Sequence, residues 1–294
     1  MQCLGRPAAR FDDESRGHRR RSFGRGPGHP ARASGARVTL FDDGRRPELL
    51  VGESLVPAVV PILQRLGLEE ETASFSRVKP GVSFIWSPND RFSSPSRASR
   101  RAYTPTPTTS RARRFDDAVL ARAVASGVER VVAHARMEPI TDEGRELGLA
   151  PETLAAAPSL GGRQPDLVVD ATGRARLGAR ALNIGAHYGP RKDVAHFAHF
   201  ENFAWDDEPG QVLIRRLDAG WSWCIRSASV SRSVSCWGAT TPRGSARARP
   251  SGSKRAIATD PWLSTIGRDS KRVTSVATYA NYQLISHRGL GPAG

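Results

Sequence analysis

Residues 52–67 read Gly-Glu-Ser-Leu-Val-Pro-Ala-Val-Val-Pro-Ile-Leu-Gln-Arg-Leu-Gly, and this stretch decides the fold more than any other. Its apolar side chains recur at the i, i+4, i+8 and i+11 spacing of one helix face, which predicts a helix over residues 53–66. Ser54 is placed to cap the first turn, and Gly67 is placed to end the last one. The apolar positions are Leu55, Val59, Leu63 and Leu66.

Two short apolar segments, one on each side of this helix, are predicted to be strands. Residues 35–42 follow a glycine turn and end in the acid Asp42. Residues 166–170 read Asp-Leu-Val-Val-Asp and are typical of a buried strand. This second strand ends at Asp170 and leads into a turn at Gly173.

A second helix and a β-hairpin complete the predicted elements. A helix is predicted for residues 115–127, with Asp116 and Asp117 at the positive end of the helix dipole and Gly127 at its C-terminal end. Its predicted apolar face consists of Val119, Leu120, Ala123 and Val124. Residues 211–225 alternate in polarity on both sides of a turn at residues 218–220, which predicts a hairpin. The alternating positions are Val212 and Ile214 on one arm and Trp221, Trp223 and Ile225 on the other.

The net charge of +15 first suggests a nucleic-acid partner. The surplus of arginine, however, is concentrated in residues 1–37, 91–114 and 226–255, and the rest of the chain is mildly acidic. The sequence contains no helix-turn-helix, zinc-finger or aromatic-interleaved basic motif. We therefore expect no nucleic-acid partner, because the positive charge belongs to these stretches and not to the fold.

Cysteine usage and hydropathy favour a cytoplasmic protein. The three cysteines form no Cys-x-x-Cys motif, so neither a disulfide framework nor a zinc site is expected. No apolar run approaches the roughly 20 residues that span a bilayer, and the Arg-rich N-terminus lacks the apolar region of a secretory signal. Residues 194–200 alternate like a strand. This places His196 and His199 on opposite faces and argues against a metal site.

Asp42 occupies the position of the acid that binds the adenosine ribose in a dinucleotide-binding βαβ unit. The matching phosphate-binding turn would be Gly24-x-Gly26, but its third glycine position is occupied by His29, and Gly28 precedes it. An Arg-rich segment stands where the preceding apolar strand should be. Alone, this motif is a weak indication of a nucleotide site.

Ordered blocks along the chain resemble the flavin-dependent halogenases and their monooxygenase-like relatives. The segment Gly52-Glu53-Ser54-x-x-Pro57 is similar to their Gly-Glu-Ser-x-x-Pro motif, and Trp221-x-Trp223-x-Ile225 is similar to their Trp-x-Trp-x-Ile-Pro signature, with Arg226 replacing the proline. The other blocks, in order, are Phe115-Asp116-Asp117-x-x-Leu120 and Asp170-Ala171-Thr172-Gly173.

This resemblance implies an α/β fold, in which a glutathione-reductase-like FAD-binding domain carries an inserted mixed β-sheet substrate domain. It implies FAD as cofactor, a flavin reductase or NAD(P)H as reductant, halide, and a small aromatic or carrier-bound substrate. In such enzymes reduced flavin and oxygen give a C4a-hydroperoxide, and halide attacks it. The residues expected at the cofactor are Gly24, Gly26, Gly28, Asp42, Gly52, Glu53, Ser54, Asp170 and Gly173.

Lys79 precedes Pro-Gly-Val-Ser-Phe and resembles the lysine of the Lys-x-Gly-x-x-Phe segment in phenol-type halogenases. An amine there could hydrogen-bond hypohalous acid or form a haloamine, and burial would lower its pKa. A solvated loop lysine is the alternative. The tandem tryptophans Trp221 and Trp223 would separate substrate from flavin and favour halogenation, whereas a monooxygenase would hydroxylate its substrate directly.

Three stretches depart from the resemblance and divide the chain. Residues 35–90 and 114–180 are expected to form a partial FAD-binding domain, and residues 181–294 a partial substrate domain that ends before the family's final flavin-binding segment. Residues 1–34, 91–113 and 226–258 read as aberrant, and no strand is predicted in them. Their abrupt change to Arg, Ser and Pro suggests out-of-frame translation of a GC-rich gene and an incomplete, non-functional product. Resequencing the gene tests this hypothesis, because an intact frame would contradict it.

Overall fold

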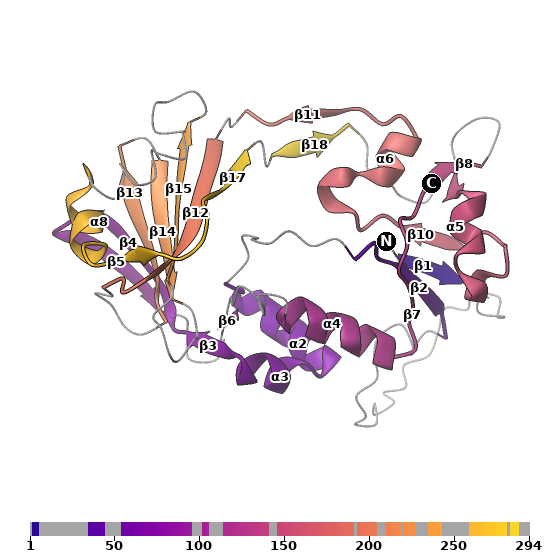
Figure 1. Ribbon diagram of the computed structural model, residues 1–294, viewed down its shortest axis with the longest axis horizontal. Coiled ribbons are helices and arrows are strands. Elements are labelled where there is room, and N and C mark those ends of the chain that lie inside the picture. Colours follow the sequence, from indigo (N-terminus) through magenta and orange to yellow (C-terminus); the bar gives the residue numbers. More distant parts are fainter. Residues whose placement is uncertain are drawn as a thin grey trace, which may run out of the picture.

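The computed structural model describes residues 2–5, 35–44, 54–95, 102–105, 114–140, 146–190, 193–204, 210–218, 220–226, 235–242, 259–280 and 283–287. Figure 1 shows a large sheet at one end, a small sheet at the other, and helices between and beside them. Gly24, Gly26, Gly28, Gly52 and Glu53 lie outside the described residues. No described helix is long and apolar enough to cross a membrane.

The large sheet has the strand order β16-β12-β15-β14-β13-β4-β5, and β17 also pairs with β12. Among the described pairings of this sheet only that of β13 with β4 is parallel, so the sheet is mixed, as predicted. Its strands are β4 (Gly81–Ser87), β5 (Asp90–Pro95), β12 (Asp193–Glu201), β13 (Val212–Leu217), β14 (Gly220–Arg226), β15 (Ser235–Pro242), β16 (Lys271–Arg272) and β17 (Ala277–Ala280).

The hairpin predicted for residues 211–225 is confirmed. Strands β13 and β14 pair antiparallel, and Leu217 lies opposite Gly220, so the connection consists of two residues. The alternation of the second arm places Trp223 on one face of the sheet and Cys224 on the other. Strand β12 likewise confirms the alternation that puts His196 and His199 on opposite faces.

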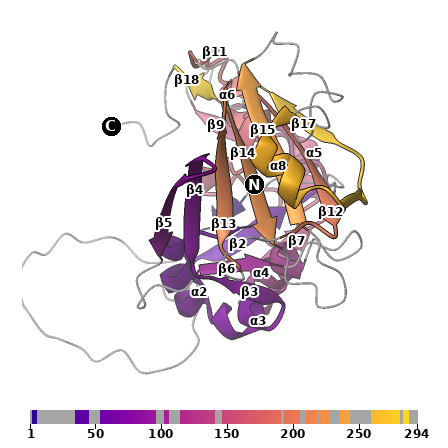
Figure 2. The same cartoon turned by 90° about the vertical axis from the view of Figure 1, so that its left-hand side faces the viewer.

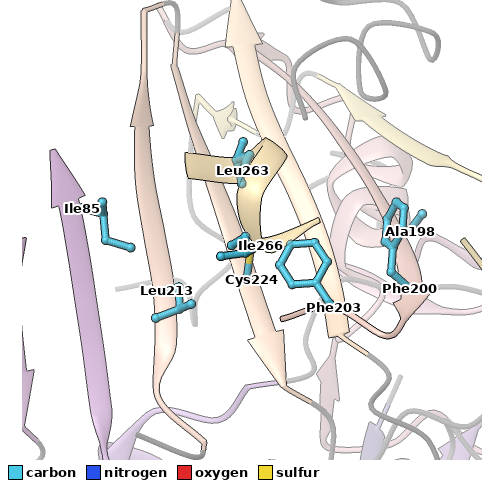
Figure 3. Packing of buried hydrophobic residues seen from close by; sticks show 8 residues of the cluster. All are labelled: Ile85, Ala198, Phe200, Phe203, Leu213, Cys224, Leu263 and Ile266. Carbon is cyan, nitrogen blue, oxygen red and sulfur yellow. The ribbon is translucent and has the colours of Figure 1, made fainter. Parts of the chain in front are cut away.

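Helix α8 (Pro261–Ile266) covers the outer face of the large sheet, where Figure 2 shows it in front of the strands. Figure 3 shows Leu263 and Ile266 of this helix beside the sheet residues of one buried cluster. Asp260 caps the helix by accepting a hydrogen bond from the Leu263 N–H at 2.9 Å, and it also pairs with Arg215 of β13 at 2.9 Å. The ion pair and the cap therefore fix α8 to the sheet.

The small sheet has the order β10-β1-β2-β7. Its strands are β1 (Gln2–Gly5), β2 (Arg37–Phe41), β7 (Glu129–Val131) and β10 (Leu167–Val169). Strand β2 confirms the prediction for residues 35–42. Strand β10 also forms, but the expectation that it is buried was wrong: Leu167 is 49% exposed and Val169 37% exposed. The apolar sequence correctly predicts a strand here, but it does not determine whether other elements pack over the side chains of that strand.

A second buried cluster lies beside the small sheet and contains Phe41 of β2 and Leu149. The elements on this side are the hairpin of β8 (Met137–Pro139) and β9 (Leu147–Leu149), the helices α5 (Pro151–Ala155) and α6 (Leu177–Ala181), and the 3-10 turns η2 (Pro158–Leu160) and η3 (Gly173–Ala175). A two-stranded ribbon of β11 (Ala186–Tyr188) and β18 (Leu284–Ser286) runs along the top of Figure 1.

The helix predicted for residues 53–66 begins later than expected. Its elements are η1 (Pro57–Val59) and α2 (Val60–Leu66), followed by α3 (Glu69–Ser74). Val56, the residue before Pro57, is extended at φ −88° and ψ 155°, because a residue that precedes proline is disfavoured in the helical region. The N-cap role predicted for Ser54 was therefore wrong. The apolar face is confirmed, since Leu63 is buried and Leu55, Val59 and Leu66 pack against its cluster.

Helix α4 (Arg114–Ala125) completes this cluster, and its buried face differs from the predicted one. Ala118 is buried and Phe115 packs beside it, whereas Val119 is 36% exposed and Val124 45% exposed. The paired strands β3 (Ser76–Lys79) and β6 (Ala102–Pro105) lie next to these helices, on the side toward the large sheet (Figure 1).

The three Arg-rich stretches do contain strands, contrary to expectation: β1, β5, β6 and β15. The most central is β15, which pairs with β12 on one side and β14 on the other. Its sequence, Ser-Cys-Trp-Gly-Ala-Thr-Thr-Pro, carries no charge, and its proline stands at the very end, where a missing N–H is tolerated. Averaging over residues 226–258 concealed this segment between its charged flanks.

Gly67→Ala is expected to destabilise the fold more than Gly127→Ala. Both glycines follow a helix at positive φ, 66° and 91°, where an alanine costs about 1–2 kcal/mol. A Cβ at Gly67 would also lie 2.5 Å from Nη2 of Arg122, whose Nε donates to the Leu66 carbonyl at 2.7 Å, while a Cβ at Gly127 meets open space. Denaturant unfolding of the two variants measures the difference, and equal losses would contradict this account.

Candidate functional site

The parallel strands of the small sheet bring two predicted cofactor residues to one edge. Strands β2, β7 and β10 run in the same direction, so their carboxyl ends share an edge. Asp42 follows β2 and Asp170 follows β10, and Gly173 makes its turn at φ 58° just beyond. In open α/β sheets ligands bind at this edge. Asp42 thus lies at the edge where a ribose-binding acid is expected, and Asp170 lies at the same edge.

Both carboxylate oxygens of Asp42 already have protein partners. Oδ2 accepts a hydrogen bond from Nη2 of Arg130 at 2.8 Å, and Oδ1 accepts one from the Gly44 N–H at 3.1 Å. Arg130 belongs to the neighbouring strand β7, and sequence reasoning missed it because the pairing spans 88 positions. A ribose at Asp42 would have to share or displace these contacts.

Asp170 is a structural residue as well as an edge residue. It accepts hydrogen bonds from the Thr172 N–H at 3.0 Å, from the Thr172 hydroxyl at 2.5 Å and from the Gly178 N–H of α6 at 2.8 Å. Burial by itself raises the pKa of Asp170, but these bonds to its ionised form outweigh burial, and the pKa lies below the usual value. The carboxylate thus holds the turn around Gly173 against α6.

The phosphate end of the dinucleotide site does not match. In a βαβ unit the first strand runs parallel to its neighbours, and its carboxyl end delivers the glycine turn to the shared edge. Here β1 is antiparallel to both β2 and β10. The first residue of β1, Gln2, lies opposite Leu40 near the carboxyl end of β2, where Asp42 follows. The last residue, Gly5, lies opposite Arg37 at the amino end of β2. The described residues therefore fit the ribose of FAD in part and do not form its pyrophosphate turn.

Lys79 and Ser54 are brought together. Nζ of Lys79 donates a hydrogen bond to the Ser54 hydroxyl at 2.8 Å, although the two residues are 25 positions apart. Lys79 ends strand β3 and is 7% exposed, so it is not the solvated loop lysine of the alternative interpretation. Desolvation lowers its pKa from the ordinary 10.5. The site thus contains a buried amine with an increased neutral fraction.

The strand that follows Lys79 leads into an aromatic surface on the face of the large sheet opposite α8. Ile214 lies opposite both Phe84 and Trp223 in the sheet, and Phe84 stacks on Phe92 at 6.4 Å. We call this the aromatic face, and its members are Phe84, Trp86, Phe92, Trp221, Trp223 and Tyr279. Trp86 is 49% exposed and Phe92 59% exposed, and Arg216 lies over the Trp86 ring at 5.7 Å.

Sequence reasoning found the two tryptophans of β14 but missed Phe92, because residues 91–113 were read as aberrant. The local sequence offered little signal, since Phe92 is the only large apolar side chain of strand β5 and no alternation surrounds it. For metal ions, the described residues contain no group of three or more His, Cys, Asp or Glu side chains that could hold one.

Solved structures of flavin-dependent halogenases share the fold of this chain. The brominase Bmp2, described as flavin-dependent, has a TM-score of 0.69 at 22% identity, covering 89% of this chain and 65% of its own. The myxobacterial chondrochloren halogenase CndH has 0.69 at 24%, covering 86% and 60%.

A flavoprotein/dehydrogenase from Cytophaga hutchinsonii is also similar, with a TM-score of 0.66 at 16% identity, covering 89% of this chain and 64% of its own. The chain thus spans 60% to 65% of the length of these three proteins. At these identities the likeness establishes the fold. No family model matches the sequence, and no curated protein matches it.

Proposed function

We propose that the chain is a flavin-dependent oxidoreductase of the halogenase type, with FAD as cofactor and a flavin reductase or NAD(P)H as reductant. The observation that carries this proposal is the buried amine of Lys79, held by Ser54 beside the strand that leads into the aromatic face. The aromatic face supports a small aromatic substrate, bare or carrier-bound, because exposed Trp and Phe rings favour stacking partners.

Lys79 would act on hypohalous acid. When bound, a reduced flavin supplies the activation of oxygen that oxidises halide to this acid. The neutral amine of Lys79 either hydrogen-bonds the acid or attacks its halogen: the N–halogen bond forms, the halogen–O bond breaks, and the departing hydroxide takes the amine proton to leave as water. Only the unprotonated amine has the lone pair for this attack, and burial of Lys79 favours that form.

The antiparallel strand β1 supports weak binding of FAD, because among the described strands no glycine turn brings backbone N–H groups to the pyrophosphate at the edge with Asp42. This favours the second candidate, a chain that retains the fold and the lysine but has lost most cofactor affinity. A hydroxylase remains the alternative chemistry, since the Trp-x-Trp signature lacks its proline at Arg226.

The test supplies the cofactor from solution. The purified chain is titrated with FAD and followed by its visible spectrum, then incubated with chemically reduced FAD, oxygen, bromide and a phenol. A brominated phenol, found by mass spectrometry and lost in Lys79→Met but retained in Lys271→Met, supports the halogenase. Lys271 is an exposed lysine on β16 and serves as the matched control. A hydroxylated product would support the hydroxylase. The absence of both products would contradict both the halogenase and the hydroxylase.

A further inference from the structure

We propose that Ser54 is the positioning residue of Lys79, and that Pro57 keeps the serine hydroxyl available for this task. The inference deepens the proposed function, because it concerns the amine on which that function rests. Its first support is the 2.8 Å hydrogen bond from Nζ of Lys79 to Oγ of Ser54.

The second support is the conformation of the chain between Ser54 and the helix. A serine just before an apolar helix is expected to be its N-cap. The hydroxyl oxygen of an N-cap serine accepts a hydrogen bond from a backbone N–H two or three residues later. Pro57 has no N–H to offer at that third position, and it disfavours the helical conformation of Val56, which is extended. The helical segment consequently begins at Pro57, after a residue that provides no side-chain cap.

The hydroxyl of Ser54 therefore does not cap the helix and instead accepts the hydrogen bond from Nζ of Lys79. Lys79 has a long side chain with many rotamers, and a fixed partner restricts where its amine can point. A neutral amine that donates one N–H to Ser54 keeps its lone pair directed elsewhere. The spacing of serine and proline in residues 52–57 thus has a physical reason: the proline delays the helix so that the serine can hold the amine.

The hydrogen bond has a consequence for protonation. A hydroxyl stabilises the ammonium form more strongly than the neutral amine, because hydrogen bonds from charged donors are the stronger ones. Ser54 therefore opposes part of the effect of burial on Lys79. Removing the hydroxyl is expected to lower the pKa of Lys79 further and to leave the amine without a fixed direction.

The experiment measures the amine directly, without flavin. The full chain is labelled with trace isotopic acetic anhydride between pH 6 and 11, and the acetylation of each lysine is followed by mass spectrometry. The sequence has four lysines, so Lys79 is readily distinguished and exposed Lys271 serves as the internal reference. In Ser54→Ala the Lys79 profile should shift to lower pH and its plateau rate should fall about fivefold, the equivalent of one hydrogen bond of about 1 kcal/mol.

Matched variants make the result specific. Ser54→Thr keeps a hydroxyl and should restore the Lys79 profile, while Ser74→Ala, which removes an exposed hydroxyl bonded to the Glu71 carbonyl, should leave it unchanged. Pro57→Ala retains Ser54 but supplies the missing N–H, so the helix should extend, capture the hydroxyl and reproduce the Ser54→Ala profile. Circular dichroism establishes that each variant is folded.

An unchanged Lys79 profile in Ser54→Ala, or the same shift in Ser74→Ala, would overturn the positioning role. An unchanged profile in Pro57→Ala would overturn the role of the proline. Failure of the proposed function looks different, since the labelling profiles would hold as described while no brominated phenol formed.

Discussion

Replacing residues 1–34 with the strand, Gly-x-Gly-x-x-Gly turn and helix of a flavin-dependent halogenase is expected to raise the affinity for FAD at least about 1000-fold. Such a unit would put a parallel strand in the place of β1, between β10 and β2. Its backbone N–H groups would then reach the pyrophosphate at the edge where Asp42 and Asp170 lie. Hydrogen bonds to charged groups contribute about 1.5–3 kcal/mol each, so two or three account for this factor.

Equilibrium titration of FAD, followed by flavin fluorescence, measures this effect in the grafted and the original chain. The control is a graft in which the turn glycines are alanines, because Cβ atoms keep the backbone away from the phosphates. That graft should fold and bind FAD no better than the original chain. Tight FAD binding by the original chain would show that the antiparallel β1 does not limit the site.

The elements that sequence predicted well are those whose signal is local. The hairpin of β13 and β14 follows from alternation on both sides of a short turn, and the end of α2 follows from Gly67. Where two local preferences of the sequence competed, the prediction failed. Ser54 favoured a helix start, but the restriction that Pro57 places on Val56 was stronger, and the helical segment begins at Pro57 instead of residue 53.

The remaining differences depend on partners that are distant in sequence. The direction of β1 is set by pairing with β2 and β10, and no pattern within four residues encodes it. The engagement of Asp42 by Arg130 and the contact of Lys79 with Ser54 arise only when separate strands and loops meet. Composition misled in the other direction, since charged flanks concealed the strand-forming segment of β15.

Lys79→Met, made in the chain that carries the dinucleotide graft, is expected to reduce bromination of a phenol at least about 1000-fold, while leaving the FAD spectrum and affinity unchanged. Removing a nucleophile that acts in the chemical step eliminates its whole contribution, as with other covalent catalysts. Methionine matches the length of the lysine stem and suits its buried position, at 7% exposure. Steady-state formation of bromophenol, with bound FAD measured on the same samples, tests this.

The same variant has a second expected effect, of opposite sign, on stability. The pKa of Lys79 is lowered by burial, so the unfolded chain binds a proton more readily than the folded one in the range between that lowered pKa and the ordinary 10.5. Burial of Lys79 therefore destabilises the fold at neutral pH, and this penalty disappears as the pH rises toward 10.5. Lys79→Met should raise the denaturant midpoint at pH 7, with a gain that shrinks toward pH 10, whereas Lys271→Met should change it at neither pH.

By the same protonation argument, bromination by the lysine-containing chain should increase with pH through the lowered pKa of Lys79. A rate independent of pH, or a Lys79→Met variant less stable at pH 7, would contradict the assignment of Lys79 as a buried amine with a lowered pKa.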